Sequence, residues 1–202
     1  MRHLVIMAKQ PVAGRVKSRL AQGIGVARAT GVYRNLMTTT LRTLSTDRRW
    51  KTWMAVAPDT AVHDFHWPTG VASFPQGHGN LGVRMQRIFE TVPTGPVIII
   101  GTDIPFITGT DIAGAFSQLG SHDMVFGSAG DGGFWLVGAR RTPRTPNVFD
   151  NVRWSSEHTL TDTLTNAHTS DLKTGFATTR YDIDIKDDYQ KWRKTQKGRS
   201  QI

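Results

Sequence analysis

Apolar and polar positions along this chain follow two rhythms, one typical of strands and one typical of helices. Short apolar runs at His3–Ala8, Trp53–Ala57 and Val71–Phe74 predict buried strands. Apolar residues recur at helical spacing over Val26–Leu44 and Leu81–Val92, which predicts two amphipathic helices. The first half of the chain is therefore expected to begin as strand, helix, strand, strand and helix.

The second half continues the alternation. The segment PVIIIGTD predicts a strand buried on both faces, because four β-branched residues follow one another in it. Thr108 and Asp111 have the spacing of a capping box and predict a helix that continues to Leu119. The segment DMVFGSAGDGGFWLVG predicts two strands joined by a glycine turn. The remaining elements are expected at Ser156–Ala167 (helix), Phe176–Ile183 (strand) and Asp187–Lys194 (helix).

Strands that alternate with helices predict an α/β fold, with a mainly parallel sheet covered by helices on both faces. The tight turn between the two strands around Asp131 predicts an antiparallel member, and therefore a mixed sheet. The chain contains no internal repeat and no low-complexity linker. Residues 1–194 are therefore expected to form a single domain, followed by a basic C-terminal tail at 195–202.

Composition narrows the choice of compartment and chemistry. The 202 residues include no cysteine, which excludes disulfides, thiolate metal sites and cysteine nucleophiles and suits a reducing cytoplasm. The first apolar run is too short for a secretion signal, and no apolar segment approaches the roughly 20 residues that span a bilayer. We therefore expect a cytoplasmic protein with no membrane partner.

The net charge of +9 is unevenly distributed. Residues 1–51 carry eleven Lys and Arg against one acid, residues 52–136 carry two against seven, and residues 137–202 carry twelve against eight. The basic head and the segment KWRKTQKGR near the end make a nucleic-acid-binding module one alternative. The acidic middle would repel a phosphate backbone, and no helix-turn-helix or RNP signature is present, so nucleic acid is not an expected partner.

The first loop, AKQPVAGRVKSRLAQGIG, contains three glycines, four cations and no acid. Gly14 allows the backbone to approach a ligand closely, and Lys9, Arg15, Lys17 and Arg19 supply charge that would pair with phosphate oxygens. The loop is neither a Walker A loop nor a G-x-G-x-x-G turn. On composition alone, a phosphate-binding loop and a solvated basic loop remain equal alternatives.

Carboxylates follow two of the predicted strands. Asp103 comes directly after the most apolar strand, where it would reach a divalent cation; the alternative is that it caps the following turn. Asp182 and Asp184 are expected on one face of the last strand, where paired carboxylates repel each other unless a cation lies between them. The alternative for this pair is a solvent-facing edge strand.

Six segments of the chain together resemble a known family. They are AKQPVAGRVKSRL, QGHGNLGVRM, GTDIP, AGDGGFWLVG, VRWSSEHTL and DIDIKDD, in this order. They resemble a bacterial family of GT-A-fold transferases, described as radical-SAM/selenodomain-associated transferases or glycosyltransferases and similar to molybdenum-cofactor and 2-phospholactate guanylyltransferases. The first two segments look like the motifs K-x-P-x-x-G-x-x-K-T-R-L and Q-x-x-G-D-L-G-x-R of that family. The resemblance runs nearly end to end and implies a single GT-A (nucleotide-diphospho-sugar transferase, Rossmann-like) domain.

The resemblance also implies where a nucleotide, a metal ion and an acceptor would bind. The nucleotide would contact Lys9, Gly14, Arg15, Lys17, Arg19, Gln76 and Gly82. The ligands of Mg²⁺ or Mn²⁺ would be Asp103 and Asp184 or Asp182. The acceptor side would be lined by Asp131, Gly132, Gly133 and Trp154. Trp154 also precedes a predicted helix start, where two serine hydroxyls and backbone amides would meet an anion.

Two reactions fit such a site. In nucleotidylyl transfer an acceptor phosphate or phosphonate attacks the α-phosphorus of a nucleoside triphosphate (NTP), and Lys17 and Arg19 stabilise the departing pyrophosphate near the metal on Asp103. In glycosyl transfer a nucleoside-diphosphate (NDP) sugar reacts with an acceptor hydroxyl, and Asp131 is the candidate base. Four cations exceed what a diphosphate requires, which favours nucleotidylyl transfer. The expected partners are a nucleotide and a small-molecule acceptor.

Overall fold

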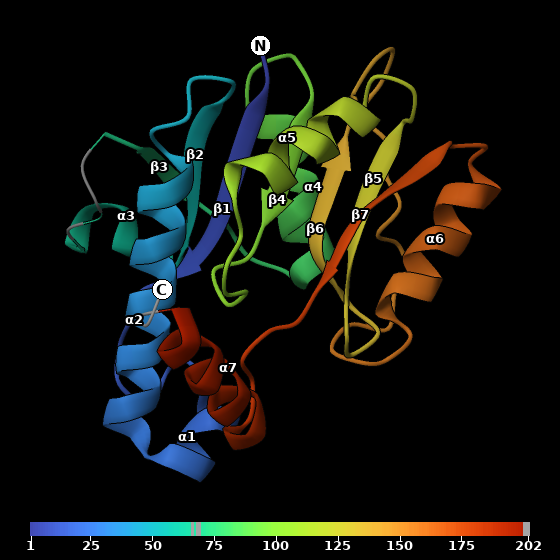
Figure 1. Ribbon diagram of the computed structural model, residues 1–202. Coiled ribbons are helices and arrows are strands. Elements are labelled where there is room, and N and C mark those ends of the chain that lie inside the picture. Colours follow the sequence, from blue (N-terminus) through green and yellow to red (C-terminus); the bar gives the residue numbers. More distant parts are fainter. Residues whose placement is uncertain (66, 68–69, 200–202) are drawn as a thin grey trace.

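The computed structural model describes residues 1–65, 67 and 70–199, and within them seven strands form one sheet (Figure 1). The order across the sheet is β3-β2-β1-β4-β6-β5-β7. Only β6 is antiparallel to its neighbours, whereas the other pairings are parallel. The predicted mixed, mainly parallel sheet is confirmed. The strands are β1 (His3–Lys9), β2 (Lys51–Ala57), β3 (Ala72–Pro75), β4 (Val97–Ile100), β5 (Met124–Ala129), β6 (Phe134–Ala139) and β7 (Thr174–Arg180).

The helices follow the predicted pattern with two additions. They are α1 (Ser18–Ile24), α2 (Val26–Leu44), α3 (Ala61–Asp64), α4 (Leu81–Thr91), α5 (Gly109–Gln118), α6 (Thr159–Thr169) and α7 (Lys186–Arg199). The two short helices α1 and α3 were not predicted, and the capping box that opens α5 is present. Helix α7 continues into the segment predicted as a tail, of which residues 200–202 lie outside the described residues. In the described part of the chain, no helix combines the length and the apolar character that crossing a membrane requires.

Alternate residues of the central strands supply two separate cores. Leu4 and Ile6 of β1 pack with α2 and α5 on one face of the sheet, while Val5 packs with α4 and α6 on the other. Strand β4 divides in the same way, with Ile98 on the first face and Ile99 on the second. All four of its residues are buried, which is why the strand lacks polar positions. Both faces of the sheet are thus covered by helices, so the edge at which the strands end is the part of the sheet that remains open to a ligand.

A third apolar cluster joins the beginning and the end of the chain. Leu20 of α1, Val32 and Leu36 of α2, and Ile183 pack together beside Trp192 of α7. Figure 1 shows α1 and α7 below the sheet edge, beside the lower end of α2. This cluster fixes the first loop against the segment that follows β7.

One strand boundary differs from the prediction in a way that matters for the site. Strand β7 ends at Arg180, so Asp182 and Asp184 lie in the irregular segment after it and not on a strand face. The alternation of acid and isoleucine has another cause. Ile183 is buried between α1 and α2, whereas Ile185 is 47% exposed.

Candidate functional site

The carboxyl ends of the parallel strands meet at one edge of the sheet, where ligands of open α/β proteins bind. A cavity of about 640 Å³ opens at this edge, between the first loop, the loop after β4 and the start of α4. Ligand pockets in proteins typically measure a few hundred to about 1,000 Å³. The charged residues on its wall are Lys9, Arg15, Lys17, Arg19, Arg84, Asp103 and Asp184.

Lys17 is the residue that the first loop directs inward. Its side chain is only 6% exposed, and its Nζ donates to Asp184 Oδ1 at 2.7 Å and to Asp103 Oδ2 at 3.3 Å. Burial by itself lowers the pKa of Lys17, but the charges of Asp103 and Asp184 outweigh it and raise the pKa above its ordinary value. Lys17 is therefore an ammonium ion held between two carboxylates that come from distant parts of the chain.

A third carboxylate, that of Asp182, lies beside the two that bind this ammonium. Asp103, Asp182 and Asp184, here called the acidic triad, each have an oxygen within 4.8 Å of the others'. Burial, followed by the charges of Asp184 and Asp103, raises the pKa of Asp182 to about 6. Lys17 and, at 3.8 Å from Asp184, Arg19 are two cations against three carboxylates, which leaves the triad short of positive charge and favours the binding of a further cation.

The other cations of the first loop are exposed on the rim of the cavity. Arg19 has 68% of its side chain exposed and lies 3.8 Å from Asp184 Oδ2. Lys9 and Arg15 are exposed as well, and Gly14 adopts the left-handed backbone with φ +77°. The structure thus brings all four predicted cations to the cavity but divides their roles: Lys17 pairs with carboxylates, whereas Lys9, Arg15 and Arg19 face solvent.

Gln76 lies on the cavity wall with its amide already engaged. It is buried, and its Nε2 donates to Ala8 O at 3.1 Å and to Ala55 O at 2.9 Å, which ties the ends of β1 and β2 together. Its Oε1 accepts from Arg84 Nη1 at 3.5 Å. Gln76 therefore shapes the wall, and the polar group next to it that faces the cavity is Arg84, which sequence reasoning had not assigned to the site.

Tyr33 is a second residue that sequence reasoning missed, because it lies inside the apolar pattern of α2. Its buried hydroxyl donates to Lys9 O at 3.0 Å and accepts from Lys9 N at 2.7 Å and from Thr102 at 3.3 Å. Burial raises the pKa of Tyr33. The hydroxyl holds the end of β1 at a fixed position relative to the residues that precede Asp103.

Gly82 and Trp154 lie away from the cavity wall, within the part of the chain that the structure describes. A Cβ at Gly82 would lie 2.5 Å from Trp154 Cζ2 and 2.7 Å from Phe149 Cβ, so only glycine permits this contact. Trp154 also packs against Phe134, at 6.4 Å between ring centres. The structure thus shows that these two residues pack against each other, and their expected contacts with nucleotide and acceptor stay predictions.

The glycine turn between β5 and β6 is likewise stabilised by contacts within the protein. Asp131 Oδ1 accepts from Gly133 N at 2.9 Å, and Asp131 is close enough to Asp182 to contribute to its raised pKa. Gly132 has φ +86°, and a Cβ there would lie 2.3 Å from Glu157 O. These residues lie beside the acidic triad, but the described cavity wall does not include them.

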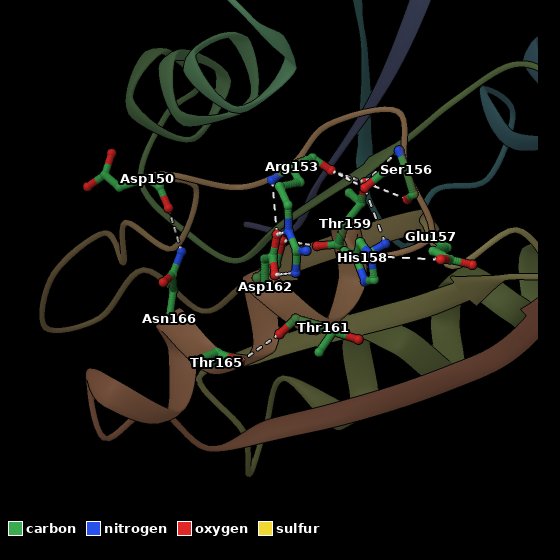
Figure 2. Close-up of polar contacts among 11 residues, drawn as sticks. Asp150, Arg153, Ser156, Glu157, His158, Thr159, Thr161, Asp162, Thr165 and Asn166 are labelled. Carbon is green, nitrogen blue, oxygen red and sulfur yellow. Dashed lines mark hydrogen bonds and ion pairs between the residues drawn. The ribbon is translucent and has the colours of Figure 1, made fainter.

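The segment 153–162 closes on itself at the start of α6 (Figure 2). Ser156 Oγ donates to Arg153 O at 2.7 Å and accepts from His158 N at 3.2 Å, and Thr159 Oγ1 donates to the same carbonyl at 2.8 Å. Arg153 forms two side-chain hydrogen bonds to Asp162, which hold the pKa of that carboxyl well below its usual range. Two of the groups predicted to meet an anion at this helix start, the Ser156 hydroxyl and the His158 amide, thus bind each other, and the anion site stays a prediction.

The donor set of the triad fits a hard divalent cation. Mg²⁺ and Mn²⁺ prefer oxygen ligands, and Mg²⁺ usually combines one or two carboxylates with phosphate oxygens. The triad offers carboxylates from two segments at the wall of a cavity whose rim carries cations suited to phosphate. Such an arrangement is able to hold a metal–phosphate complex.

Sequence comparison assigns this chain to a family. Residues 40–156, more than half of the chain, match the family DUF2064, described as an uncharacterized protein conserved in bacteria. No curated protein matches the sequence.

Solved structures show the same fold. A proposed nucleotide-diphospho-sugar transferase from Desulfovibrio desulfuricans G20 is 25% identical, with a TM-score of 0.83 over 91% of this chain and 82% of that chain. CMP:2-keto-3-deoxy-manno-octonic acid synthetase, solved with CTP, is 11% identical, with a TM-score of 0.61 over 98% and 99%. A Mycobacterium tuberculosis H37Rv protein in complex with manganese is 14% identical, with a TM-score of 0.50 over 94% and 96%. The expected GT-A-like fold is confirmed.

Proposed function

This chain belongs to the bacterial DUF2064 family, and we propose that it is a metal-dependent transferase that moves a nucleotidyl group from an NTP to a small phosphorylated or phosphonate acceptor, with release of pyrophosphate. One observation carries the proposal. The acidic triad and Lys17 converge at a cavity whose rim presents three further cations, Lys9, Arg15 and Arg19. This combination suits a triphosphate and its metal.

In this proposal the residues of the site have separate tasks. Asp103 and Asp184, with Asp182 beside them, hold Mg²⁺ or Mn²⁺, which when bound neutralises phosphate oxygens and fixes their geometry. Arg15 and Arg19 bind the outer phosphates and stabilise the pyrophosphate as it leaves. An acceptor phosphate is already ionised at neutral pH, so no side chain has to remove a proton from it.

Glycosyl transfer from an NDP-sugar is the second candidate. It is favoured by the 25% identical protein with the TM-score of 0.83, which is described as a nucleotide-diphospho-sugar transferase. The rim cations favour the triphosphate, because a diphosphate on the metal would leave part of their charge without a partner. For either reaction we propose that residues 1–194 act as one domain and that the reaction takes place in the cytoplasm.

Thermal unfolding of the protein against NTPs, NDP-sugars and a short DNA duplex, each with and without Mg²⁺ or Mn²⁺, tests the proposal. A ligand at about 100 times its Kd stabilises the folded state by about 2.7 kcal/mol, which is a measurable rise in Tm. The expected result is a metal-dependent rise with one NTP, followed by pyrophosphate release when candidate acceptors are added. A rise with an NDP-sugar alone would establish glycosyl transfer instead, and a metal-independent rise with DNA alone would contradict both.

A further inference from the structure

Lys17 fills the position that a metal ion would take between two of its expected ligands. Its Nζ lies 2.7 Å from Asp184 Oδ1 and 3.3 Å from Asp103 Oδ2, and these carboxylates come from the segments after β7 and β4. A Mg²⁺ ion ligated by both oxygens would lie about 2.1 Å from each, in the gap that the ammonium occupies. The ammonium and a metal that bridges these two carboxylates therefore exclude each other.

The backbone of Lys17 is arranged to keep the ammonium there. Its φ of 49° and ψ of 48° place it in the left-handed region, which lysine rarely adopts, at the N-cap position directly before α1. Its side chain is 6% exposed, whereas that of Arg19, two residues on, is 68% exposed and points to the rim. An unusual backbone at a charge cluster is a sign of function, and here it delivers one cation to the acidic triad.

We propose that Lys17 is a displaceable internal cation, which occupies the metal position in the free protein and leaves it when a metal ion enters together with a nucleotide. The inference rests on the proposed function and deepens it. A divalent ion next to the ammonium would be repelled by it, and burial would strengthen that repulsion. The phosphates of the nucleotide give the released ammonium a new partner, and the flexible stem of lysine allows the move.

This exchange has a thermodynamic consequence. In the absence of nucleotide, a metal ion must displace Lys17 from two carboxylates without offering it another anion, so metal alone binds weakly. Nucleotide supplies that anion, so each ligand strengthens the binding of the other by the same factor. Lys17 thereby makes the site prefer the metal–nucleotide complex over bare metal.

The first experiment is a titration of the protein with Mn²⁺ in the absence of nucleotide, with free Mn²⁺ measured by electron paramagnetic resonance. Lys17→Met keeps an unbranched side chain, one atom shorter, and removes its charge, so it is expected to bind Mn²⁺ about tenfold more tightly than the wild type. Lys9→Met is the matched control, because Lys9 lines the same cavity without an ion pair to the triad. Equal or weaker Mn²⁺ binding by a folded Lys17→Met would overturn the proposal.

A second measurement needs only the wild-type protein and covers the case in which Lys17→Met does not fold. Amine labelling by an N-hydroxysuccinimide ester, mapped by mass spectrometry, reports how accessible each lysine is. Lys17 is expected to react slowly in the free protein and faster at saturating Mn²⁺, relative to Lys9. If saturating Mn²⁺ leaves its labelling unchanged or lowers it, Lys17 stays in place beside the metal and the proposal is wrong.

The two measurements also separate this inference from the proposed function. If Mn²⁺ binds the wild type and Lys17→Met equally well, the displacement is refuted while the metal site stands. If Mn²⁺ binds neither protein, with or without an NTP, the metal site itself is wrong and the proposed function fails with it.

Discussion

The segments that resemble the transferase family lie in two parts of the structure, and their polar side chains have different partners in each. In the first loop and after β4 and β7, the charged residues Lys17, Asp103 and Asp184 contact one another at the wall of a cavity. Around the start of α6, Trp154 packs against Gly82, and the side chains of Arg153, Ser156, Thr159 and Asp162 bond within segment 153–162. The buried Nε1 of Trp154 has no hydrogen-bond partner among the residues that the structure describes. The first region keeps unbalanced charge at an opening, whereas the second pairs the charges of Arg153 and Asp162 with each other.

This difference shows how glycine-, serine- and aromatic-rich segments should be interpreted. A run of glycine, serine and aromatic residues at a helix start is equally typical of a ligand site and of a tightly packed junction. What separates the two is whether the polar groups have partners inside the protein. The predictions below test this division.

The largest effect is expected for Asp103→Asn, which removes a proposed metal ligand from the first region. Turnover should fall by about a thousandfold or more, because the charge of the phosphates is no longer balanced. The fold should persist, since the Asp103 side chain is 42% exposed and Lys17 keeps its bond to Asp184. Steady-state pyrophosphate release and the Tm measure the two quantities.

Asp171→Asn is the matched control for that prediction. Asp171 lies after α6 and does not line the cavity, and its φ of 54° is one that asparagine tolerates well. It should retain full turnover. Full metal-dependent turnover of Asp103→Asn would place the chemistry outside the acidic triad.

Gly82→Ala tests the second region and should lower stability by about 1–3 kcal/mol, because the new Cβ overlaps Trp154 and Phe149. Gly31→Ala is its control: Gly31 lies in α2, where a Cβ meets nothing within 4 Å, so the change should leave stability unchanged or raise it by about 1 kcal/mol. Urea unfolding measures both. An unchanged stability of Gly82→Ala together with a large loss of nucleotide affinity would return Gly82 to the ligand site.

Arg15→Ala should weaken nucleotide binding on the order of tenfold, because one charge-assisted contact to phosphate is lost from the rim. The loss should shrink as salt is raised, since Arg15 is exposed. Arg144→Ala removes an equally exposed charge that does not line the cavity. Calorimetric titration of both variants with nucleotide gives the comparison. Equal losses of nucleotide affinity would mean that the first loop acts only through its overall positive charge.

The smallest effect is expected from Asp182, through the pH dependence of stability. Its pKa is raised from 3.8 to about 6, so the proton stabilises the folded state. That contribution is fully present below about pH 4 and is lost as pH rises through about 6. In EDTA, the free energy of unfolding of Asp182→Asn should therefore be higher than that of the wild type above pH 7, by on the order of 1 kcal/mol after allowance for solvent screening. Below pH 4 the two proteins should be equally stable.

Thermal unfolding between pH 3.5 and 8 measures this difference. Addition of Mn²⁺ at pH 7.5 should cancel the advantage of Asp182→Asn, because the metal balances the charge that destabilises the wild type. An advantage that grows toward acid pH would show that the environment of Asp182 is not the crowded triad.

Long elements with a regular apolar pattern could be predicted from the sequence, whereas the short helices and the exact end of β7 could not. Helix α2 occupies the predicted residues because nine of its side chains are buried in a regular stripe. Helix α1 was missed because it buries only Leu20 and contains Gly23. The end of β7 was placed too late because the burial of Ile183 between helices imitates the alternation of a strand.

For the site, the carboxylates and cations could be predicted, but their pairing could not. Asp103 is visible as an acid at the end of an apolar strand, and the four cations as a cluster within one loop. The left-handed backbone that turns Lys17 inward leaves no mark in the sequence, and neither does the reach of Tyr33 from α2 to the end of β1. Such contacts depend on the strand order, which a single sequence does not specify.

The cluster of Lys17 and the acidic triad also determines when, during synthesis, the proposed metal–nucleotide site can form. Lys17 is separated along the chain from Asp103 by 86 residues and from Asp184 by 167. Proteins are synthesised from the N-terminus, and partly made chains already collapse around their early strands. A nascent chain that has not yet emerged past residue 184 carries the basic loop but lacks the carboxylates that complete the triad. The site is therefore assembled only after residue 184 has been synthesised and has left the ribosome, so shorter nascent chains carry the basic loop without the complete triad.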